Sequence, residues 1–165
     1  MQRYKKDWYD KRIKQNRNIK MHLIDLILKY KEKTLDWSDA ELVCLNYEDL
    51  FEIAVAAFNK KCDIVLGAGQ DWSCGRDGKV SIVRTNSYGK NYSAGVTGCS
   101  NKDWVLALVY EPMQEKFYYF SFPTTLKEHT IPFDINTGKA KRDNYMWRLY
   151  ECKSFEDMIK KPFTI

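Results

Sequence analysis

Four residues around a glycine-rich stretch of the sequence could together support phosphodiester hydrolysis. Asp63 lies in an apolar segment, Asp71 and Asp77 lie in the loop that follows, and Lys79 comes two residues after Asp77. Carboxylate oxygens are ligands that Mg²⁺ prefers, and a bound Mg²⁺ polarises a phosphate and activates a water molecule. An ammonium group near the reacting centre stabilises developing negative charge. The pattern indicates metal-dependent phosphodiester chemistry, and its structural alternative is a solvated Asp-Gly turn beside a strand-edge acid.

The elements that must position these residues are helices followed by strands. Apolar residues recur at helical spacing over 3–33 and over 47–61, and Asn46 is a candidate N-cap for the second helix. Beyond that helix the pattern changes to short strands separated by turns. We expect these strands at 62–67, 79–87, 92–97, 104–112, 116–123, 129–133 and 145–153, and a short helix from 154. The order predicts an α+β fold with a mostly antiparallel or mixed sheet, in which 104–123 form a hairpin and Pro132 marks an edge strand.

The segment 46–123 resembles the PD-(D/E)XK nuclease superfamily, which includes restriction, repair and intron-encoded endonucleases. The resemblance rests on a helix that bears Glu52, on Asp63 in CDIVL, on the acid-x-Lys of Asp77-Gly78-Lys79, and on a late strand ending in proline. It implies that Asp63 and Asp77 bind Mg²⁺ or Mn²⁺. It further implies that Lys79 assists the attacking water and that Glu52 completes the catalytic site. The resemblance thus implies a restriction-endonuclease-like core and a metal-dependent DNA endonuclease.

A second alignment with the same family leaves the metal site incomplete. The acid-x-Lys of 77–79 is expected in the turn that leads into a strand, whereas in the family it usually lies inside the strand. Shifting the alignment to 82–85 puts Ile82 at an acid position and Arg84 at the lysine position. This register implies a non-catalytic DNA-binding module on the same fold, with Arg84 either gripping phosphate or pairing with a neighbouring acid.

The positive charge of the protein is concentrated in one part of the sequence. Residues 1–33 carry 11 Lys/Arg against four Asp/Glu, whereas the rest of the chain carries 16 against 18. Such asymmetry is typical of binding to a polyanion, with double-stranded DNA as the first candidate and an anionic membrane surface or a solvated helix as alternatives. We expect a basic helical arm over 1–37 and a single nuclease-like domain over 38–165. The residues expected to contact phosphates are Lys5, Lys6, Lys11, Arg12, Arg84 and Lys90.

Several classes of protein do not fit the sequence. No apolar run reaches the roughly 18–20 residues of a transmembrane helix, so we expect no membrane-spanning segment. The charged start lacks the apolar core of a secretory signal, and the five cysteines are scattered without a CxxC pair, which favours a reducing cytoplasm over a disulfide framework or a zinc site. Gly78-Lys79 is not followed by Ser or Thr, so the loop is not a Walker A motif. A protein-interaction domain that docks an acidic partner stays open as a third function, and a homodimer as an assembly.

Overall fold

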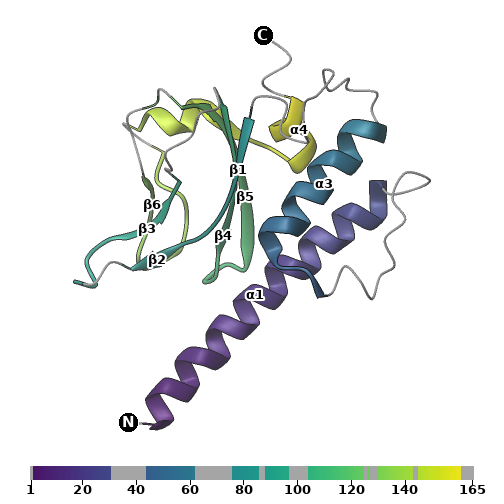
Figure 1. Cartoon of the computed structure of the whole chain (residues 1–165). Coiled ribbons are helices and arrows are strands. Elements are labelled where there is room, and N and C mark those ends of the chain that lie inside the picture. The colour runs from purple at the N-terminus through teal and green to yellow at the C-terminus, as the bar shows by residue number, and fades with distance from the viewer. Residues whose placement is uncertain are drawn as a thin grey trace. The chain divides into compact units, whose positions relative to one another are not determined.

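A computed structural model of the chain describes residues 2–30, 44–61, 76–85, 88–96, 104–124, 126, 130–142 and 145–160. The chain divides into two compact units, residues 1–66 and residues 67–165. The described part of the first unit is helical, and that of the second consists mainly of strands (Figure 1). The α+β class expected from the sequence is therefore confirmed.

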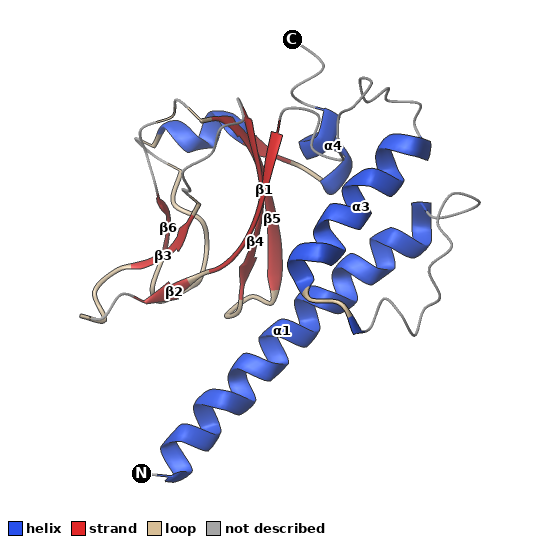
Figure 2. Ribbon diagram, in the orientation of Figure 1, coloured by secondary structure: helices blue, strands red, loops and turns tan. Residues whose placement is uncertain are grey.

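The helical unit is built from two helices that lie side by side, α1 (Gln2–Tyr30) and α3 (Tyr47–Lys61) (Figure 2). Apolar side chains in the second half of α1 recur every four residues, and Ile19, Leu23 and Ile27 are fully buried. The ring of Tyr30 ends this stripe against Phe58, with ring centroids 5.0 Å apart and planes at 73°. The helix expected at the start of the sequence is confirmed as one continuous helix. Within the described ranges, no helix has the length and apolar character to cross a membrane.

Helix α3 begins with the cap that the sequence predicts. Oδ1 of Asn46 accepts a hydrogen bond from the backbone N–H of Asp49 at 2.9 Å, and the Asn46 carbonyl accepts one from Leu50 at 3.1 Å. Glu48 and Asp49 occupy the first turn, where the helix dipole stabilises negative charge. The apolar face of α3 is buried. Its buried residues are Leu50, Phe51, Ala54, Val55, Ala57 and Phe58.

The second unit contains a four-stranded mixed sheet in the order β1-β4-β5-β7. Its strands are β1 (Arg76–Ile82), β4 (Trp104–Glu111), β5 (Lys116–Pro123) and β7 (Glu151–Cys152). Strand β1 runs parallel to β4, whereas β4 and β5 form the antiparallel hairpin that the sequence predicts. Every residue of β4 after Trp104 is buried, and Val105, Ala107 and Val109 on one face of the strand belong to the core between the sheets.

The strand that begins as β1 bends at Val83 and continues into a second sheet. The backbone N–H of Val83 still bonds to the carbonyl of Tyr110 at 2.9 Å, which extends the pairing with β4 by one residue. The second sheet is antiparallel, in the order β2-β3-β6, with β2 (Arg84–Thr85), β3 (Tyr92–Gly95) and β6 (Thr130–Phe133). Beyond β6 the described part of the chain adds only the isolated bridge between Phe133 and Ala140. The edge position expected for Pro132 is confirmed.

The two sheets face each other and enclose the core of this unit (Figure 1). The rings of Tyr118 from β5 and Phe133 from β6 meet edge to face, with centroids 5.2 Å apart. The other side chains of this core come from alternate positions along the strands. They include Val83, Tyr92, Ala94, Val105, Ala107, Val109, Phe120, Phe122 and Ile131. Because successive residues of a strand point to opposite faces, the residues between them in β3 and β6 point away from the core.

One carboxylate is completely buried where β4 turns into β5. Glu111 accepts hydrogen bonds from the Tyr92 hydroxyl at 2.5 Å and from the backbone N–H groups of Met113 and Gln114 at 2.7 Å each. Gly138 lies against it with φ of 78°, and a Cβ at this position would come within 2.7 Å of Oε2 of Glu111. The side-chain amide of Gln114 also donates to the Gly138 carbonyl at 2.6 Å. The carboxylate therefore ties the β4–β5 turn to Tyr92 of β3, and Gln114 of that turn in turn bonds the loop that contains Gly138.

The prediction of a last strand over 145–153 is wrong for most of this segment. A 3₁₀-helix, η1 (Met146–Tyr150), takes its place, and only the two residues of β7 are extended. Trp147 is buried edge to face on Phe120 with centroids 5.2 Å apart, while Leu149 is 57% exposed. A strand would put Trp147 and Leu149 on one face, whereas a 3₁₀-helix aligns residues three apart, so Trp147 and Tyr150 both pack on the core. Helix α4 (Phe155–Lys160) then begins after Ser154, as predicted.

Candidate nucleic-acid interface

The acid-x-Lys lies inside a strand. Strand β1 begins at Arg76, so Asp77, Gly78 and Lys79 are strand residues, and the expectation of a turn at 77–79 was wrong. Asp77 pairs with Val105 and Lys79 with Ala107 of the parallel neighbour β4. This pairing holds the segment extended, although its glycine disfavours a strand by itself. Positions 77 and 79 therefore belong to the same face of the sheet, and Lys79 is half-buried.

The other residues expected at a catalytic site lie in the helical unit or outside the described residues. Glu52 is exposed on α3 and belongs to the helical unit, whereas Asp77 and Lys79 belong to the sheet unit. Asp63 and Asp71 lie outside the described residues. Within the described residues, no three His, Cys, Asp or Glu side chains gather as metal ligands. The part of the site that the structure positions is the acid-x-Lys itself.

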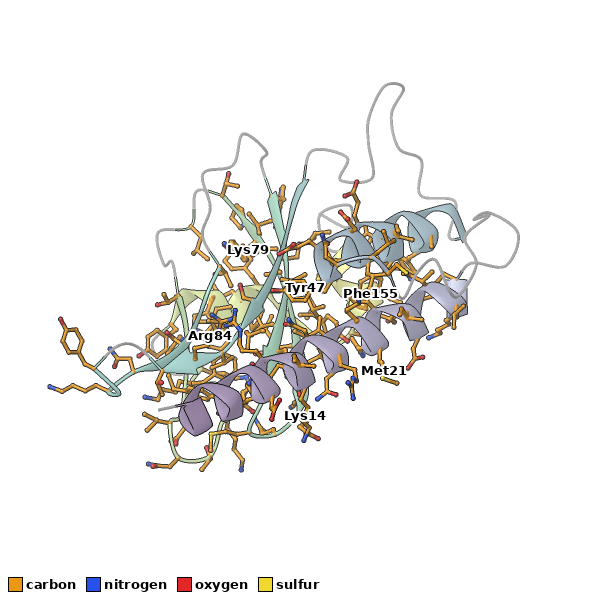
Figure 3. All side chains as sticks on the ribbon, turned by 60° about the horizontal axis from the view of Figure 1, so that its bottom comes forward. Lys14, Met21, Tyr47, Lys79, Arg84 and Phe155 are labelled. Atoms are coloured by element: carbon orange, nitrogen blue, oxygen red, sulfur yellow. The ribbon has the colours of Figure 1, made fainter. Side chains whose placement is uncertain are left out.

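The residues of the second alignment lie on either side of the bend. Ile82 is the last residue of β1 and is buried, whereas Arg84 is the first residue of β2 and is exposed. Figure 3 labels Lys79 and Arg84 at successive points along this bent strand. Because the strand passes from one sheet to the other at Val83, the two candidates for the family's lysine position, Lys79 and Arg84, lie in different sheets.

The basic residues expected to grip phosphates at the start of the chain share one continuous helix. Lys5, Lys6, Lys11 and Arg12 all lie in the first half of α1, and no acidic residue occupies its first turn. Lys11 is exposed and Arg12 is half-buried, and the exposed Lys14 follows one turn along (Figure 3). Cations near a helix N-terminus add to the positive end of the helix dipole, and the segment 3–20 carries eight Lys/Arg against two acids, Asp7 and Asp10.

A hollow of about 500 Å³ opens beside β3 and β6 in the sheet unit. Two exposed lysines border it, Lys90 before β3 and Lys141 beyond β6, and Tyr145 forms part of its wall. A smaller hollow of about 390 Å³ shares Lys141 and Tyr145 and adds Arg142. Lys90 was expected at a phosphate contact, whereas Lys141 was recognisable in the sequence only as a cation in an exposed loop.

The loop that carries Lys141 is held by hydrogen bonds at both of its ends. Oδ1 of Asp134 accepts the backbone N–H groups of Asn136 and Thr137 at 2.7 and 3.0 Å, and these bonds lower the pKa of its carboxyl group. At the other end, Nε and Nη2 of Arg142 donate to the two carboxylate oxygens of Glu151 at 2.9 and 2.8 Å. This paired bonding raises the pKa of the Arg142 guanidinium. The loop therefore holds its cations on a defined backbone.

Comparisons of the chain with protein-family models, with curated proteins and with solved structures found no match. The nuclease-like core implied by the resemblance therefore stays a prediction. The described part exposes cations, hydroxyl groups and aromatic rings as well as carboxylates such as Glu52 and Asp157, and it holds one acid-x-Lys in β1. Cations, hydroxyl groups and aromatic rings are groups that bind phosphate-bearing polymers.

Proposed function

We propose that this protein binds nucleic acid, with double-stranded DNA as the first partner, through the basic segment 3–20 of α1. The observation that carries the proposal is that one continuous helix presents the whole cluster of cations. Its members are Arg3, Lys5, Lys6, Lys11, Arg12, Lys14, Arg17 and Lys20. At about 1.5 Å per residue they extend over about 26 Å, which is long enough to follow several phosphates of a duplex.

The expected contacts are with phosphates and not with base edges. Lysine and arginine that neutralise phosphates release counterions, and each neutralised phosphate contributes about −0.9 to the slope of log K against log salt for duplex DNA. No amide side chain lies between Lys5 and Arg12, so nothing in the sequence marks Lys5, Lys6, Lys11 and Arg12 as a set of base-reading residues. Binding through α1 should therefore be strong at low salt and similar on all sequences.

The test is a quadruple variant in which Lys5, Lys6, Lys11 and Arg12 are changed to Gln. Affinity for a labelled duplex is measured by fluorescence anisotropy over a range of salt concentrations. We expect weaker binding by a similar factor on unrelated sequences, and a salt slope shallower by about 2–4 units. The matched control removes the same charge from exposed residues of the sheet unit, at Lys116, Arg148, Lys153 and Lys160. An unchanged slope in the helix variant, or an equal change in the control, would contradict the proposal.

A second candidate function is metal-dependent DNA cleavage, which the strand position of the acid-x-Lys favours. Asp77 and Lys79 are two residues apart in β1, which is the arrangement that the nuclease resemblance requires inside a strand. Asp63 and Asp77 would hold Mg²⁺ or Mn²⁺ through carboxylate oxygens, and such an ion polarises the phosphate and activates water. Lys79 would stabilise the negative charge that develops, and Glu52 would act as an auxiliary acid.

Cleavage is tested on supercoiled plasmid with Mg²⁺ or Mn²⁺, comparing the wild type with Asp77→Ala and Lys79→Ala. Loss of cutting in both variants with retained duplex binding supports the endonuclease, whereas equal cutting by all three proteins removes this site assignment. Robust binding without metal-dependent cutting by the wild type favours the non-catalytic DNA-binding module. Absence of nucleic-acid binding at low salt favours the protein-interaction domain. Light scattering of the same samples tests the homodimer.

A further inference from the structure

Four residues form a row across the outer face of the sheet β2-β3-β6. The fourth lies one position beyond β6. Arg84 of β2 pairs with Ser93 of β3, which pairs with Pro132 of β6. The backbone N–H of Lys141 bonds to the carbonyl of Pro132 at 3.0 Å, next to the bridge between Phe133 and Ala140. Antiparallel partners lie on the same face, so Arg84, Ser93, Pro132 and Lys141 share one side of the sheet.

This side points away from the core. The residues that alternate with the row, among them Val83, Tyr92, Ile131 and Phe133, belong to the buried cluster between the sheets. The row ends in a cation at each edge, and three strand spacings separate the two ends by about 14 Å. Ser93 and Pro132 lie between the two cations, and their short side chains leave room for a long ligand across the strands.

The hollow described above is lined by Ser93, Thr130 and Pro132 of this face and also by the apolar groups of Tyr92, Phe133 and Ile135. Its polar lining comes from Lys90, Asn91, Ser93, Thr130, Lys141 and Tyr145. Asn91, Ser93 and Thr130 supply an amide and two hydroxyl groups between the two lysines, and these groups donate hydrogen bonds to phosphate oxygens. Cations at the borders with neutral donors between them match a chain of phosphates.

An exposed aromatic side chain stands at the tip of the turn that leads into this face. Tyr88 is 81% exposed, and Gly89 beside it takes a positive φ of 67°, which makes the tight turn before Lys90. A ring this exposed is available to stack on an unpaired base. Tyr145, half-buried, forms part of the wall of the hollow.

The charge balance of the face is positive. Among the described residues of this face, Arg84, Lys90 and Lys141 are cations, and Asp134 is a carboxylate that interacts with Lys141 and already accepts two backbone N–H groups of its own loop. Opposite charge attracts the phosphates of a nucleic acid to such a face. A base-stacking ring next to a cationic track is the arrangement by which proteins bind single strands with little sequence preference.

We propose that the outer face of the sheet β2-β3-β6 binds single-stranded nucleic acid, with Arg84, Lys90 and Lys141 on its phosphates and Tyr88 stacked on a base. This surface does not need helix α1, so it adds a second binding site to the proposed duplex-binding helix. It assigns a role to Lys141 and Tyr88. For Arg84 and Lys90 it changes the expected partner from duplex to single strand.

The experiment measures binding of a labelled 12-nucleotide thymidine oligomer, and of a duplex of equal length, to the full chain by anisotropy. In the triple variant Arg84→Gln, Lys90→Gln and Lys141→Gln we expect a salt slope for the single strand that is shallower by about 2 units, because each phosphate contributes about 0.7. Tyr88→Ala should weaken single-strand binding about tenfold, and Tyr88→Phe, which keeps the ring, should not. A control variant changes Lys116, Arg148 and Lys153 to Gln, which removes the same charge elsewhere on the unit.

The helix variant of the preceding section separates the two proposals. If the single strand still binds when Lys5, Lys6, Lys11 and Arg12 are Gln, and is lost in the triple variant, the sheet face is the site. If the triple variant and Tyr88→Ala bind the single strand as the wild type does, the sheet-face proposal is overturned while the helix proposal stands. Equal loss of single strand and duplex in the triple variant would also overturn it, because the face would then not prefer unpaired strands. Circular dichroism confirms that each exposed-residue variant is folded.

Discussion

In the helical unit the candidate binding cations follow one another along a single helix, whereas in the sheet unit three cations reach one face from three separate segments. Lys5 to Lys20 depend only on the continuity of α1. Arg84, Lys90 and Lys141 depend on the bend at Val83, on the register of β2, β3 and β6, and on a loop held against Glu111. A binding surface built on one helix should keep its affinity after most single substitutions elsewhere in the protein. A binding surface assembled from distant segments should not.

The largest expected effect comes from removing the buried carboxylate of the sheet unit. Glu111→Ala leaves the Tyr92 hydroxyl and two backbone N–H groups without their acceptor, and we expect a loss of about 3 kcal/mol in the free energy of unfolding. Urea denaturation measures it. The change should also weaken single-strand binding, because the loop that bears Lys141 rests on this carboxylate, and should leave helix-dependent duplex binding intact.

The control for that change is Asp157→Ala, which removes an exposed carboxylate from the first turn of α4 and should lower the free energy of unfolding by only about 0.5 kcal/mol. Similar stability losses in both variants would mean that the buried network is unimportant. Loss of duplex binding in Glu111→Ala at a temperature where the protein is folded would contradict the contrast between the two surfaces.

A smaller effect is expected at the glycine that contacts the same carboxylate. Gly138→Ala combines a positive φ with a Cβ that meets Glu111 at 2.7 Å, and we expect a loss of about 2 kcal/mol. Gly89→Ala is the matched control, since it has φ of 67° but no atom within 4 Å of the added Cβ, and should lose about 1 kcal/mol. Thermal unfolding of both variants tests whether the close approach to Glu111 matters beyond backbone strain. Equal losses would show that it does not.

In the helical unit, the corresponding change is local and its effect is smaller. Asn46→Ala removes the acceptor for the Asp49 N–H at the start of α3, which should lower the free energy of unfolding by about 1 kcal/mol. Asn46→Asp keeps an acceptor and should retain most of the stability. Salt slopes for duplex binding should be the same in both variants and in the wild type. A changed slope would mean that the basic helix depends on the packing of α3 more than the comparison assumes.

The last effect appears only at alkaline pH. Burial raises the pKa of Tyr119 to about 12, so the folded state holds a proton that the unfolded chain releases near pH 10. The contribution of Tyr119 to stability is therefore complete below about pH 10 and is lost as the pH rises toward 12. Tyr119→Phe should flatten the fall in unfolding free energy over this range, while the difference between variant and wild type stays constant from pH 7 to 9. A fall of unchanged steepness in the variant would exclude Tyr119 as a cause.

Burial and a hydrogen bond to Glu111 also raise the pKa of Tyr92. Tyr92→Phe should therefore flatten the same alkaline range, and it also removes one of the bonds to the carboxylate. Comparing it with Tyr119→Phe separates the pH effect of burial alone from that of the Glu111 network.

The features that the sequence alone determined are those that depend on neighbours in the chain. The period of apolar residues predicts α1 and α3, and the side chain of Asn46 reaches an N–H only three residues away. The β4–β5 hairpin also follows from adjacent strands and a short turn. The cationic first half of α1 belongs to the same group, because a continuous helix keeps residues that are close in sequence close in space.

Only the tertiary structure decided which segments come together across long separations. The acid-x-Lys lies in a strand because β4, far along the chain, pairs with it in parallel, and local sequence around Gly78 favours a turn. The expected strand at 145–153 became a 3₁₀-helix because Trp147 and Tyr150 both fill the core between the sheets. Lys141 joins Arg84 on one face through β-sheet register, which no pattern within either segment specifies. Packing and pairing partners that are distant in sequence set these outcomes, and local propensity is too weak to override them.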